Sequence, residues 1–401
     1  MEVGTVSSRI LLLLSIKEEG RYIPFDHVYE KVARDTLAAE KKKLSPESVK
    51  AELQSLLEAG LVEQNSVGYA ITDQGEMELA KTLKEERTGF NRSYALVWKA
   101  RRYYAKAGPA LLPFLRGRAV SVIKVFSGKQ DPINEVNALF VRYKRYKPSP
   151  VPITIDEEKE LEALVDDHAI DFIPYVSSLG KDYPDYLILD LDAGEELKKT
   201  ERGFLIIKAV ATQIANLLDE CDVNYLLKFS GSRGFQIWAR LDNSSPSLSN
   251  RGDLFAFYRQ VAIALRDRVE TDLQADKSWV EQYGLENVHW PVTSSVVAKK
   301  DERANQVLID WSSMKPNGDA RAPYSIHYRT GLVSLPISAR DIKAFERGMA
   351  DPENLLEEGI SAVAPPEPSD PEKLLKRIGL ARSPYKLGNP EGKACPSEAG
   401  R

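Results

Sequence analysis

Two aspartates at the end of an apolar run are the residues of this sequence best suited to chemistry. In YLILDLDAGEE, residues 186–196, the run delivers Asp190 and Asp192 to the mouth of a predicted strand. Side chains alternate between the faces of a strand, so the two carboxylates share one face with their Cα atoms roughly 6 to 7 Å apart. Such a pair of hard oxygen ligands suits Mg²⁺ or Mn²⁺ bound to the phosphates of a nucleotide. The alternative is a strand that simply ends in an acidic loop.

Two further segments place polar residues next to strand-like runs. In LLKFSGSRGFQIW, the small residues 231–234 would let backbone amides approach a phosphate. Ser230 adds a hydroxyl, Arg233 a permanent charge and Gln236 an amide donor, although a plain hairpin loop would show the same glycines. In QVLIDWSS, three apolar residues lead to Asp310 as the first run leads to its own aspartates. The sequence therefore predicts three carboxylates delivered by two apolar strands, with a basic turn between them.

Composition narrows the classes of protein that this sequence can represent. The 401 residues, 43% of them hydrophobic, can bury a sizeable core and allow two or three domains. The sequence has neither an apolar run near the length of a membrane span nor a signal-peptide pattern, so we expect a cytoplasmic protein with no membrane partner. Two cysteines and four scattered histidines do not give the close spacing of a structural zinc site. No zinc is therefore expected, and any metal must bind to carboxylates.

A local excess of positive charge lies within this acidic chain. The net charge is -4, yet residues 98–147 hold twelve Lys and Arg against two acidic residues. Aromatic residues are interleaved with these cations, which is the mixture that neutralises phosphates and stacks bases. The alternative is a solvated basic face above aromatic core residues.

The N-terminal region predicts three helices followed by a short hairpin and a polar helix. The helices are expected at 7–18, 25–38 and 45–58, the hairpin turn at 65–68, and the polar helix from residue 73. Ser45 can cap the third helix and Pro46 fits its first position. Three helices and a wing resemble a winged helix-turn-helix domain, with the third as recognition helix. Three glutamates on that helix discourage phosphate contact, so a protein-binding or dimerising winged helix is the alternative.

Further along the chain, strands alternate with helices and then give way to a polar tail. The alternation runs from about residue 91 to 349 and predicts an α/β domain. After Pro352 the sequence is rich in Pro, Glu, Ser and Gly, which favours a flexible tail with one short helix at 372–378. The predicted domains are 1–88, a winged helix-turn-helix, 89–349, the catalytic domain, and 350–401, the flexible tail.

The order of the three motifs carries a family resemblance. A DxD pair, then SGxRGx with a polar residue after it, then an apolar run ending in Asp resembles the archaeo-eukaryotic primase superfamily, which includes replicative primase small subunits and ligase D polymerase domains. The similarity extends over most of residues 100–340. APYS resembles the ligase D form, whereas SIHYRTGL resembles the SLHGKTGL segment of primase small subunits. The resemblance implies an α/β (α+β) primase-polymerase core with an RRM-like sheet, preceded by the winged helix-turn-helix.

The resemblance also implies roles for individual residues. Asp190, Asp192 and Asp310 would be the catalytic residues and would hold two Mg or Mn ions. The phosphates of the incoming nucleotide would contact seven further residues, which are Ser230, Arg233, Gln236, Lys124, Arg142, His327 and Arg329. Cationic side chains suit such a polyphosphate ligand.

Four departures from the family pattern qualify these expectations. Gln236 stands where the family has His; it can donate a hydrogen bond to a phosphate oxygen but can neither carry charge nor shuttle a proton. The positions of an Arg and a Lys in ligase D relatives are held here by Lys124 and Arg142, which preserves charge but not geometry. The Lys-containing entry segment that those relatives use on a 5'-phosphate, and the primase zinc motif, are not found.

These features predict a metal-dependent, template-directed nucleotidyltransferase, a primase or polymerase of DNA replication or repair. Its partners would be DNA template and primer, nucleoside triphosphates, and a ligase, helicase or replication protein bound through the winged helix or the tail. One alternative is a catalytically attenuated nucleic-acid-binding or assembly protein on the same fold, because Gln236 replaces the family His. Another is a winged-helix transcription regulator with a nucleotide-sensing domain.

Overall fold

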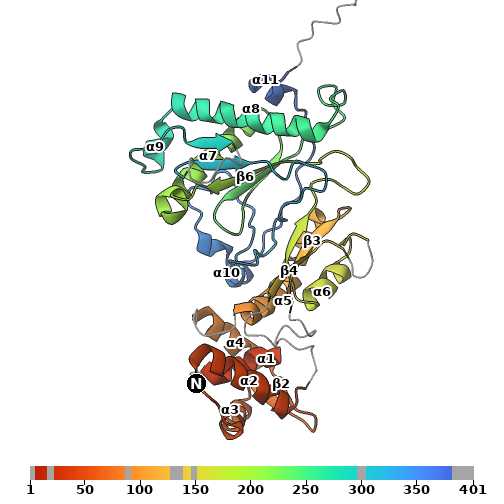
Figure 1. Cartoon of the computed structure of the whole chain (residues 1–401), viewed down its shortest axis with the longest axis vertical. Helices are drawn as coiled ribbons and strands as arrows, with labels where there is room; N and C mark the ends of the chain where they lie inside the picture. Colours follow the sequence, from red (N-terminus) through yellow and green to blue (C-terminus); the bar gives the residue numbers. More distant parts are fainter. Residues whose placement is uncertain are drawn as a thin grey trace, which may run out of the picture.

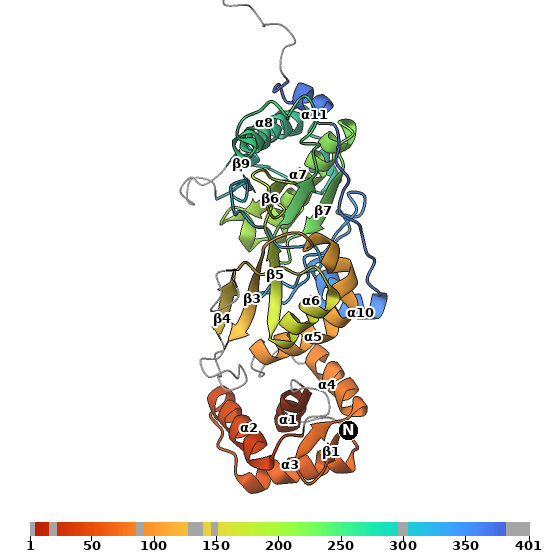
Figure 2. The same cartoon turned by 90° about the vertical axis from the view of Figure 1, so that its right-hand side faces the viewer.

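The computed structural model describes residues 5–15, 22–85, 92–126, 139–145, 151–295 and 304–381. Three sheets follow one another along the long axis of the molecule (Figure 1 and Figure 2). The N-terminal helices and a two-stranded sheet lie at one end, a three-stranded sheet lies in the middle, and a five-stranded sheet lies at the other end. This mixture of helices and sheets confirms the predicted α/β fold class.

The N-terminal elements follow the predicted order. They are α1 (Thr5–Ser15), α2 (Phe25–Glu40), α3 (Pro46–Glu58), β1 (Val62–Gln64), β2 (Tyr69–Ile71) and α4 (Asp73–Glu85). Helix α3 begins as expected, because the Ser45 side chain accepts a hydrogen bond from the Ser48 amide and Pro46 occupies the first turn. The predicted end of the first helix, residues 16–18, falls outside the described residues. The assignment of these elements to a winged-helix domain stays a prediction.

The middle of the molecule is a three-stranded antiparallel sheet covered by two helices. It is built from α5 (Arg92–Leu111), η1 (Leu112–Phe114), β3 (Val120–Phe126), β4 (Leu139–Tyr143), α6 (Glu158–Asp166) and β5 (Ala169–Pro174), with the strand order β4-β3-β5. Phe172 of β5 packs edge-on against Tyr104 of α5, so this face of the sheet is the helix-covered one. At the other end of α5, the Trp98 indole donates a hydrogen bond of 3.0 Å to Glu76 on α4, which links the N-terminal helices to the core.

The five-stranded sheet has the order β7-β8-β6-β10-β9. Its elements are β6 (Leu187–Ala193), η3 (Leu197–Lys199), α7 (Glu201–Glu220), β7 (Tyr225–Phe229), β8 (Phe235–Ala239), α8 (Leu254–Ala275), α9 (Ser278–Gln282), β9 (Thr293–Ser295) and β10 (Val307–Asp310). Strand β10 is antiparallel to β6 and parallel to β9. Helices α7 and α8 pack on the sheet as long covering elements (Figure 1).

Cross-strand register gives the two faces of the five-stranded sheet opposite character. One row of directly paired residues, Phe229, Phe235, Leu191 and Ile309, is fully buried. Phe204 of α7 stacks on Phe235, so this row faces the covering helix. Because side chains alternate along each strand, the adjacent row must face the other side. That adjacent row carries the polar residues of the candidate site.

Residues after 350 differ from the flexible tail that the sequence predicts. They form α10 (Pro352–Glu358), which follows η5 (Arg347–Ala350) and packs on α5. An extended segment, residues 359–371, comes next and is called the strap; it leads to α11 (Glu372–Arg377). The strap is held by backbone bonds from Asp242 to Ser369 and from Ser369 to Arg240, and by a bond from the Asn224 amide to the Ser369 hydroxyl. The prediction of flexibility is therefore wrong for residues 351–381, because a proline-rich segment can order itself by pairing with backbone that is already fixed. The short helix is confirmed, and residues 382–401 lie outside the described residues.

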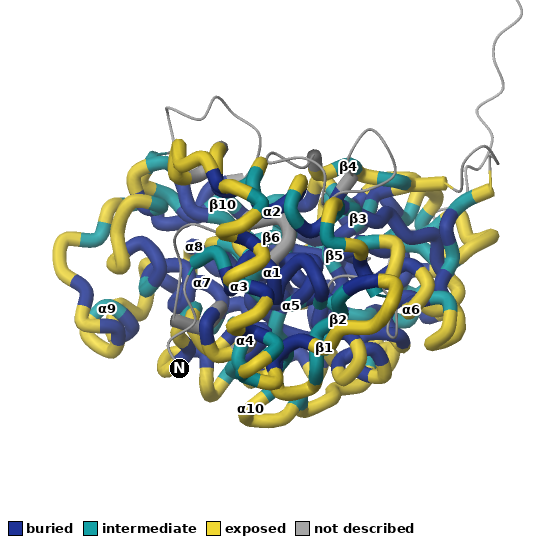
Figure 3. The backbone as a smooth tube through the Cα atoms, turned by 90° about the horizontal axis from the view of Figure 1, so that it is seen from below, coloured by how far each residue is buried: buried dark blue, intermediate teal, exposed yellow. Residues whose placement is uncertain are grey.

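Buried residues form the interior along the long axis of the molecule. Seen along that axis, the buried segments gather in the interior and the exposed ones form the rim (Figure 3). The core is one continuous cluster that runs from α1 to α11. None of the helices in the described ranges is long and apolar enough to cross a membrane.

We expect Ser369→Ala to lower the free energy of unfolding, measured by urea denaturation, by about 1 to 3 kcal/mol. Ser369 is buried, and its hydroxyl accepts a 2.7 Å hydrogen bond from the Asn224 amide that would be left without a partner. The control is Ser66→Ala at an exposed turn position. Equal stabilities of the two variants would contradict a structural role for the strap.

Candidate active site

The polar row of the five-stranded sheet brings together residues from four strands. In the register, Asp310 on β10 lies opposite Asp190 on β6, Asp190 lies opposite Gln236 on β8, and Gln236 lies opposite Lys228 on β7. Asp192 follows two residues after Asp190 on the same face. The structure thus groups all three predicted aspartates on one face of the sheet, on the neighbouring strands β6 and β10.

Mutual repulsion and burial perturb the carboxylate at the centre of this row. Burial, assisted by the negative charges of Asp192 and Asp310, raises the pKa of Asp190 to about 6. The Lys228 ammonium and a hydrogen bond with Gln236 act in the opposite direction. A cation placed between the carboxylates would relieve the repulsion, and hard oxygen donors are the ligands that Mg²⁺ and Mn²⁺ prefer.

Two of the three carboxylates bond to residues near them in the chain. Asp192 accepts a 3.0 Å bond from the Ala193 amide, and Asp310 accepts bonds of 2.7 and 3.0 Å from the amide and hydroxyl of Ser312. Within the described ranges, no group of three or more His, Cys, Asp or Glu side chains is gathered closely enough to hold a metal ion. The donor chemistry and the shared face of β6 and β10 fit a divalent cation, whereas the Asp192 and Asp310 side chains bond to neighbouring groups of the chain.

Gln236 is buried beside the central aspartate. Its amide oxygen lies 3.4 Å from the Trp238 indole nitrogen, and its side chain hydrogen-bonds Asp190. The side chain is only 6% exposed. Gln236 therefore lies next to a candidate metal ligand, with Trp238 within hydrogen-bond distance of its amide oxygen.

The glycine-rich turn between β7 and β8 packs against a second turn at residues 327–332. Gly231 has a φ of 80°, and a Cβ there would meet His327 Cβ at 2.9 Å, so only glycine permits this approach. The Thr330 hydroxyl donates to the Gly231 carbonyl. The Ser230 hydroxyl accepts bonds of 3.3 Å from the Ser232 and Gly234 amides. The two turns thus form one wall, on which Arg233 and Arg329 are exposed.

His327 is held in one orientation within this wall. Its Nδ1 accepts hydrogen bonds from the Arg329 and Thr330 amides at 3.3 and 3.2 Å. Burial, assisted by the nearby guanidinium of Arg321, lowers the pKa of His327 to about 4. The ring is therefore neutral near pH 7 and carries its proton on Nε2, as a hydrogen-bond donor rather than a cation.

The two remaining predicted residues lie on opposite faces of the three-stranded sheet. Arg142 is paired with Ile123, so Lys124, the next residue on β3, points to the other side. Arg142 forms an ion pair with Asp319, whereas Lys124 forms one with Asp167 on the helix-covered side, beside the Tyr143 ring. The structure does not bring Lys124 together with the other candidates.

Sequence reasoning missed three charged residues near the site, of which two, Lys228 and Asp171, are buried. Lys228 is fully buried, donates a 2.6 Å bond to the Ser334 hydroxyl, and has a pKa lowered by burial. A lysine inside the apolar run LLKF was the signal that could have identified it. Asp171 and Arg321, which pair with each other, carry no such signal because they lie 150 residues apart in the sequence.

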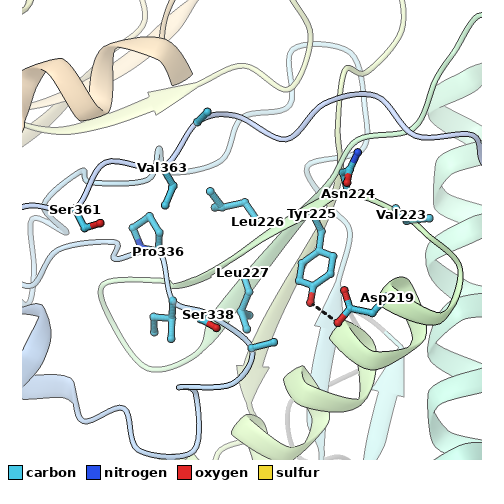
Figure 4. A pocket seen from close by; sticks show the side chains of 13 residues that line it. Asp219, Val223, Asn224, Tyr225, Leu226, Leu227, Pro336, Ser338, Ser361 and Val363 are labelled. Atoms are coloured by element: carbon cyan, nitrogen blue, oxygen red, sulfur yellow. Dashed lines mark hydrogen bonds between the residues drawn. The ribbon is translucent and has the colours of Figure 1, made fainter.

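A cavity of about 590 Å³ lies elsewhere, along the outer edge of β7. Figure 4 shows it between Leu226 and Leu227 on β7, Pro336, and Val363 of the strap, with the Tyr225 hydroxyl bonded to Asp219. None of the three aspartates lines this cavity, so it is separate from the candidate active site.

We expect Asp190→Asn to stabilise the metal-free protein more at about pH 8 than at about pH 5. The folded protein holds the Asp190 proton more tightly than the unfolded chain, where Asp titrates near about 4. The protonated carboxyl therefore favours the folded state below about pH 4, and this contribution is lost as the pH rises through about 6. Urea unfolding in EDTA at both pH values measures the change in the free energy of unfolding. Asp182→Asn, at an exposed position, is the control. A stability gain that does not change with pH would contradict the perturbed carboxyl.

Comparisons with known proteins bear on the whole region that carries this site. The family described as LigD, primase-polymerase domain, matches residues 99–358. Among solved structures, the polymerase domain of ligase D from Mycobacterium tuberculosis, in complex with DNA, is 18% identical, covers 71% of this chain and 92% of its own, and has a TM-score of 0.47. A search of curated proteins finds no match. The family match spans more than half of the chain and includes all three aspartates, so the chain belongs to the LigD primase-polymerase domain family.

Proposed function

We propose that this protein is a metal-dependent, template-directed nucleotidyltransferase that adds nucleotides to the 3'-hydroxyl of a DNA primer. The observation that carries the proposal is the register of the five-stranded sheet. It sets Asp310 directly opposite Asp190, with Asp192 on the same face and the glycine-rich turn on the neighbouring strands. Family membership supports the same chemistry, because the match includes each of these elements.

The three aspartates would hold divalent Mg or Mn. Bound there, the metal would lower the pKa of the attacking hydroxyl and neutralise the pyrophosphate that leaves. The chain itself then needs to supply positioning and donors rather than acid-base chemistry. This requirement fits a site in which Gln236 replaces a histidine and His327 is neutral.

The wall formed by the two turns would bind the triphosphate. Arg233 and Arg329 are exposed on it, and the His327 Nε2–H supplies a neutral donor between them. Arg142 would contribute from the facing sheet by exchanging Asp319 for a phosphate oxygen. Lys124 is omitted from the proposed set because its ion pair lies on the helix-covered side.

Template and primer would bind along the exposed cations that follow Arg142. Lys144 and Arg145 continue the basic stretch at the end of β4, and both are exposed. Contacts of this kind neutralise phosphates without reading sequence. A winged-helix domain at the N-terminus would then serve a protein partner of replication or repair, because its third helix exposes Glu47 and Glu58.

A second candidate function is that of an attenuated, nucleic-acid-binding member of the family. The bonds of two carboxylates favour it, since Asp192 bonds the Ala193 amide and Asp310 bonds the amide and hydroxyl of Ser312. The two functions differ in whether DNA-bound protein extends a primer when a metal is supplied.

We expect the wild-type protein to extend a 5'-labelled primer on a DNA template with Mn²⁺ or Mg²⁺, and Asp190→Ala with Asp192→Ala to reduce the rate by a factor of about 1,000 or more. Both aspartates are proposed metal ligands, so neither loss can be compensated by the other. Parallel reactions without primer, with ribo- and deoxynucleotides, define the mode of synthesis. Asp182→Ala, at an exposed position, is the control. Undiminished extension by the double variant would overturn the proposal.

We expect Gln236→His to change the extension rate by less than about tenfold, because the metals and the fixed donors carry the reaction. A proton-transferring side chain typically contributes about 100-fold or more. A gain of that size in the variant, measured at saturating nucleotide, would favour the attenuated protein instead. Gln236→Asn is the matched control, since it keeps the amide but cannot reach as far.

A further inference from the structure

We propose that the buried pair Asp171 and Arg321 positions the glycine-rich turn and the His327 turn for the triphosphate. This inference rests on the proposed function, because it assigns the two turns to nucleotide binding. Neither residue faces the phosphates as a ligand in this account. Their role is to hold the backbone of both turns in one arrangement before the nucleotide arrives.

The two side chains meet with bidentate geometry in the interior. Arg321 Nε and Nη2 each donate to a different Asp171 oxygen, both at 2.8 Å. Asp171 is fully buried and the Arg321 side chain is 14% exposed. Two parallel charge-assisted bonds fix the plane of the guanidinium as well as its distance. The remaining Arg321 nitrogen is therefore aimed in a defined direction.

That remaining nitrogen reaches the glycine-rich turn. Arg321 Nη1 donates a 3.1 Å hydrogen bond to the Ser230 carbonyl, at the point where β7 ends and the turn begins. The bond comes from outside the five-stranded sheet, because Asp171 lies on β5 of the three-stranded sheet. Arg321 thus connects the two sheets at the start of the turn that bears Arg233.

Asp171 also holds the second turn. Its Oδ1 accepts a 3.2 Å bond from the Ser325 hydroxyl and its Oδ2 a 3.4 Å bond from the Tyr328 amide. These two residues bracket His327, so one carboxylate fixes the backbone on both sides of that ring. Ser325 is fully buried and accepts in turn from the Phe172 amide at 2.7 Å, which leaves it little freedom.

We expect a specific loss of function when the contact between Asp171 and Arg321 is weakened. Removing the bidentate contact would release the Ser230 carbonyl and the backbone around His327 together, while the aspartate row on β6 and β10 keeps its own register bonds. Triphosphate binding should therefore fail before primer binding does. A misplacement of about 1 Å in a positioned group is enough to cost on the order of 100-fold in rate.

Arg321→Lys is the variant that tests this inference. It keeps a cation beside Asp171, so no buried carboxylate loses its counter-charge, but an ammonium cannot bond two carboxylate oxygens and the Ser230 carbonyl in one plane. We expect the KM for GTP and dGTP to rise by about 10- to 100-fold, with the Kd for primer–template within about twofold of wild type. Asp171→Asn keeps the shape of the Asp171 side chain but removes its charge. It should likewise raise the KM for GTP and dGTP and leave the Kd for primer–template nearly unchanged.

The control is Arg118→Lys, at another buried Arg–Asp pair. Arg118 lies 2.8 Å from Asp185, with exposed fractions of 9% and 6%, and it also bonds a backbone carbonyl, that of Tyr175. Arg118→Lys should lower the melting temperature, because it weakens a buried pair, and should leave the KM for GTP and dGTP unchanged. If Arg321→Lys behaves like this control, the pair is merely structural and the inference is overturned.

Titration with α,β-methylene GTP, followed by tryptophan fluorescence, separates this inference from the proposed function. If wild type binds the analogue but extends no primer, the polymerase proposal fails, and a 10-fold or greater weakening in Arg321→Lys still supports the positioning role. If wild type extends a primer and Arg321→Lys binds the analogue equally well, only the positioning role is overturned. If wild type fails to bind the analogue, both are overturned.

Discussion

Antiparallel pairing of β6 with β8 and β10 determines where each functional side chain of the large sheet can lie. The pairing sets Asp190 between Gln236 and Asp310, and a slip of one residue would send all three into the helix-covered face. The neighbouring row of large apolar residues prevents that slip, since Phe235 is stacked under Phe204 and fully buried. Burial on one face of the sheet therefore enforces the chemistry on the other.

The same burial makes it energetically costly to keep several negative charges at the site. Carboxylates gathered near the interior repel one another, and Lys228 two strands away is the cation that the described part of the fold places in the same row. A fixed ammonium at that distance opposes the repulsion only partly, as the raised pKa of Asp190 indicates. A site that is costly without a counter-ion is suited to bind one, which ties the stability of the sheet to its proposed cofactor.

Local signals in the sequence were sufficient for the strands, the aspartates and the capped third helix. Apolar runs ending at Asp192 and Asp310 predict both strands, and Ser45 with Pro46 predicts where α3 begins. Contacts between distant segments were not predictable in this way. Periodicity carries no information on the pairing of Asp171 with Arg321, on which face of β3 receives Lys124, or on the order imposed on the strap by Ser369.

We propose that the three aspartates act together as one divalent-cation site. Mn²⁺ binding, followed by electron paramagnetic resonance of the free ion in the presence of a non-hydrolysable triphosphate, tests it most directly. We expect Asp310→Asn and Asp190→Asn each to weaken Mn²⁺ binding by about 10-fold or more, while Asp182→Asn leaves it unchanged. Equal Mn²⁺ affinity in all four proteins would contradict this proposal, because the three carboxylates would then share one face of the sheet without binding a common ion.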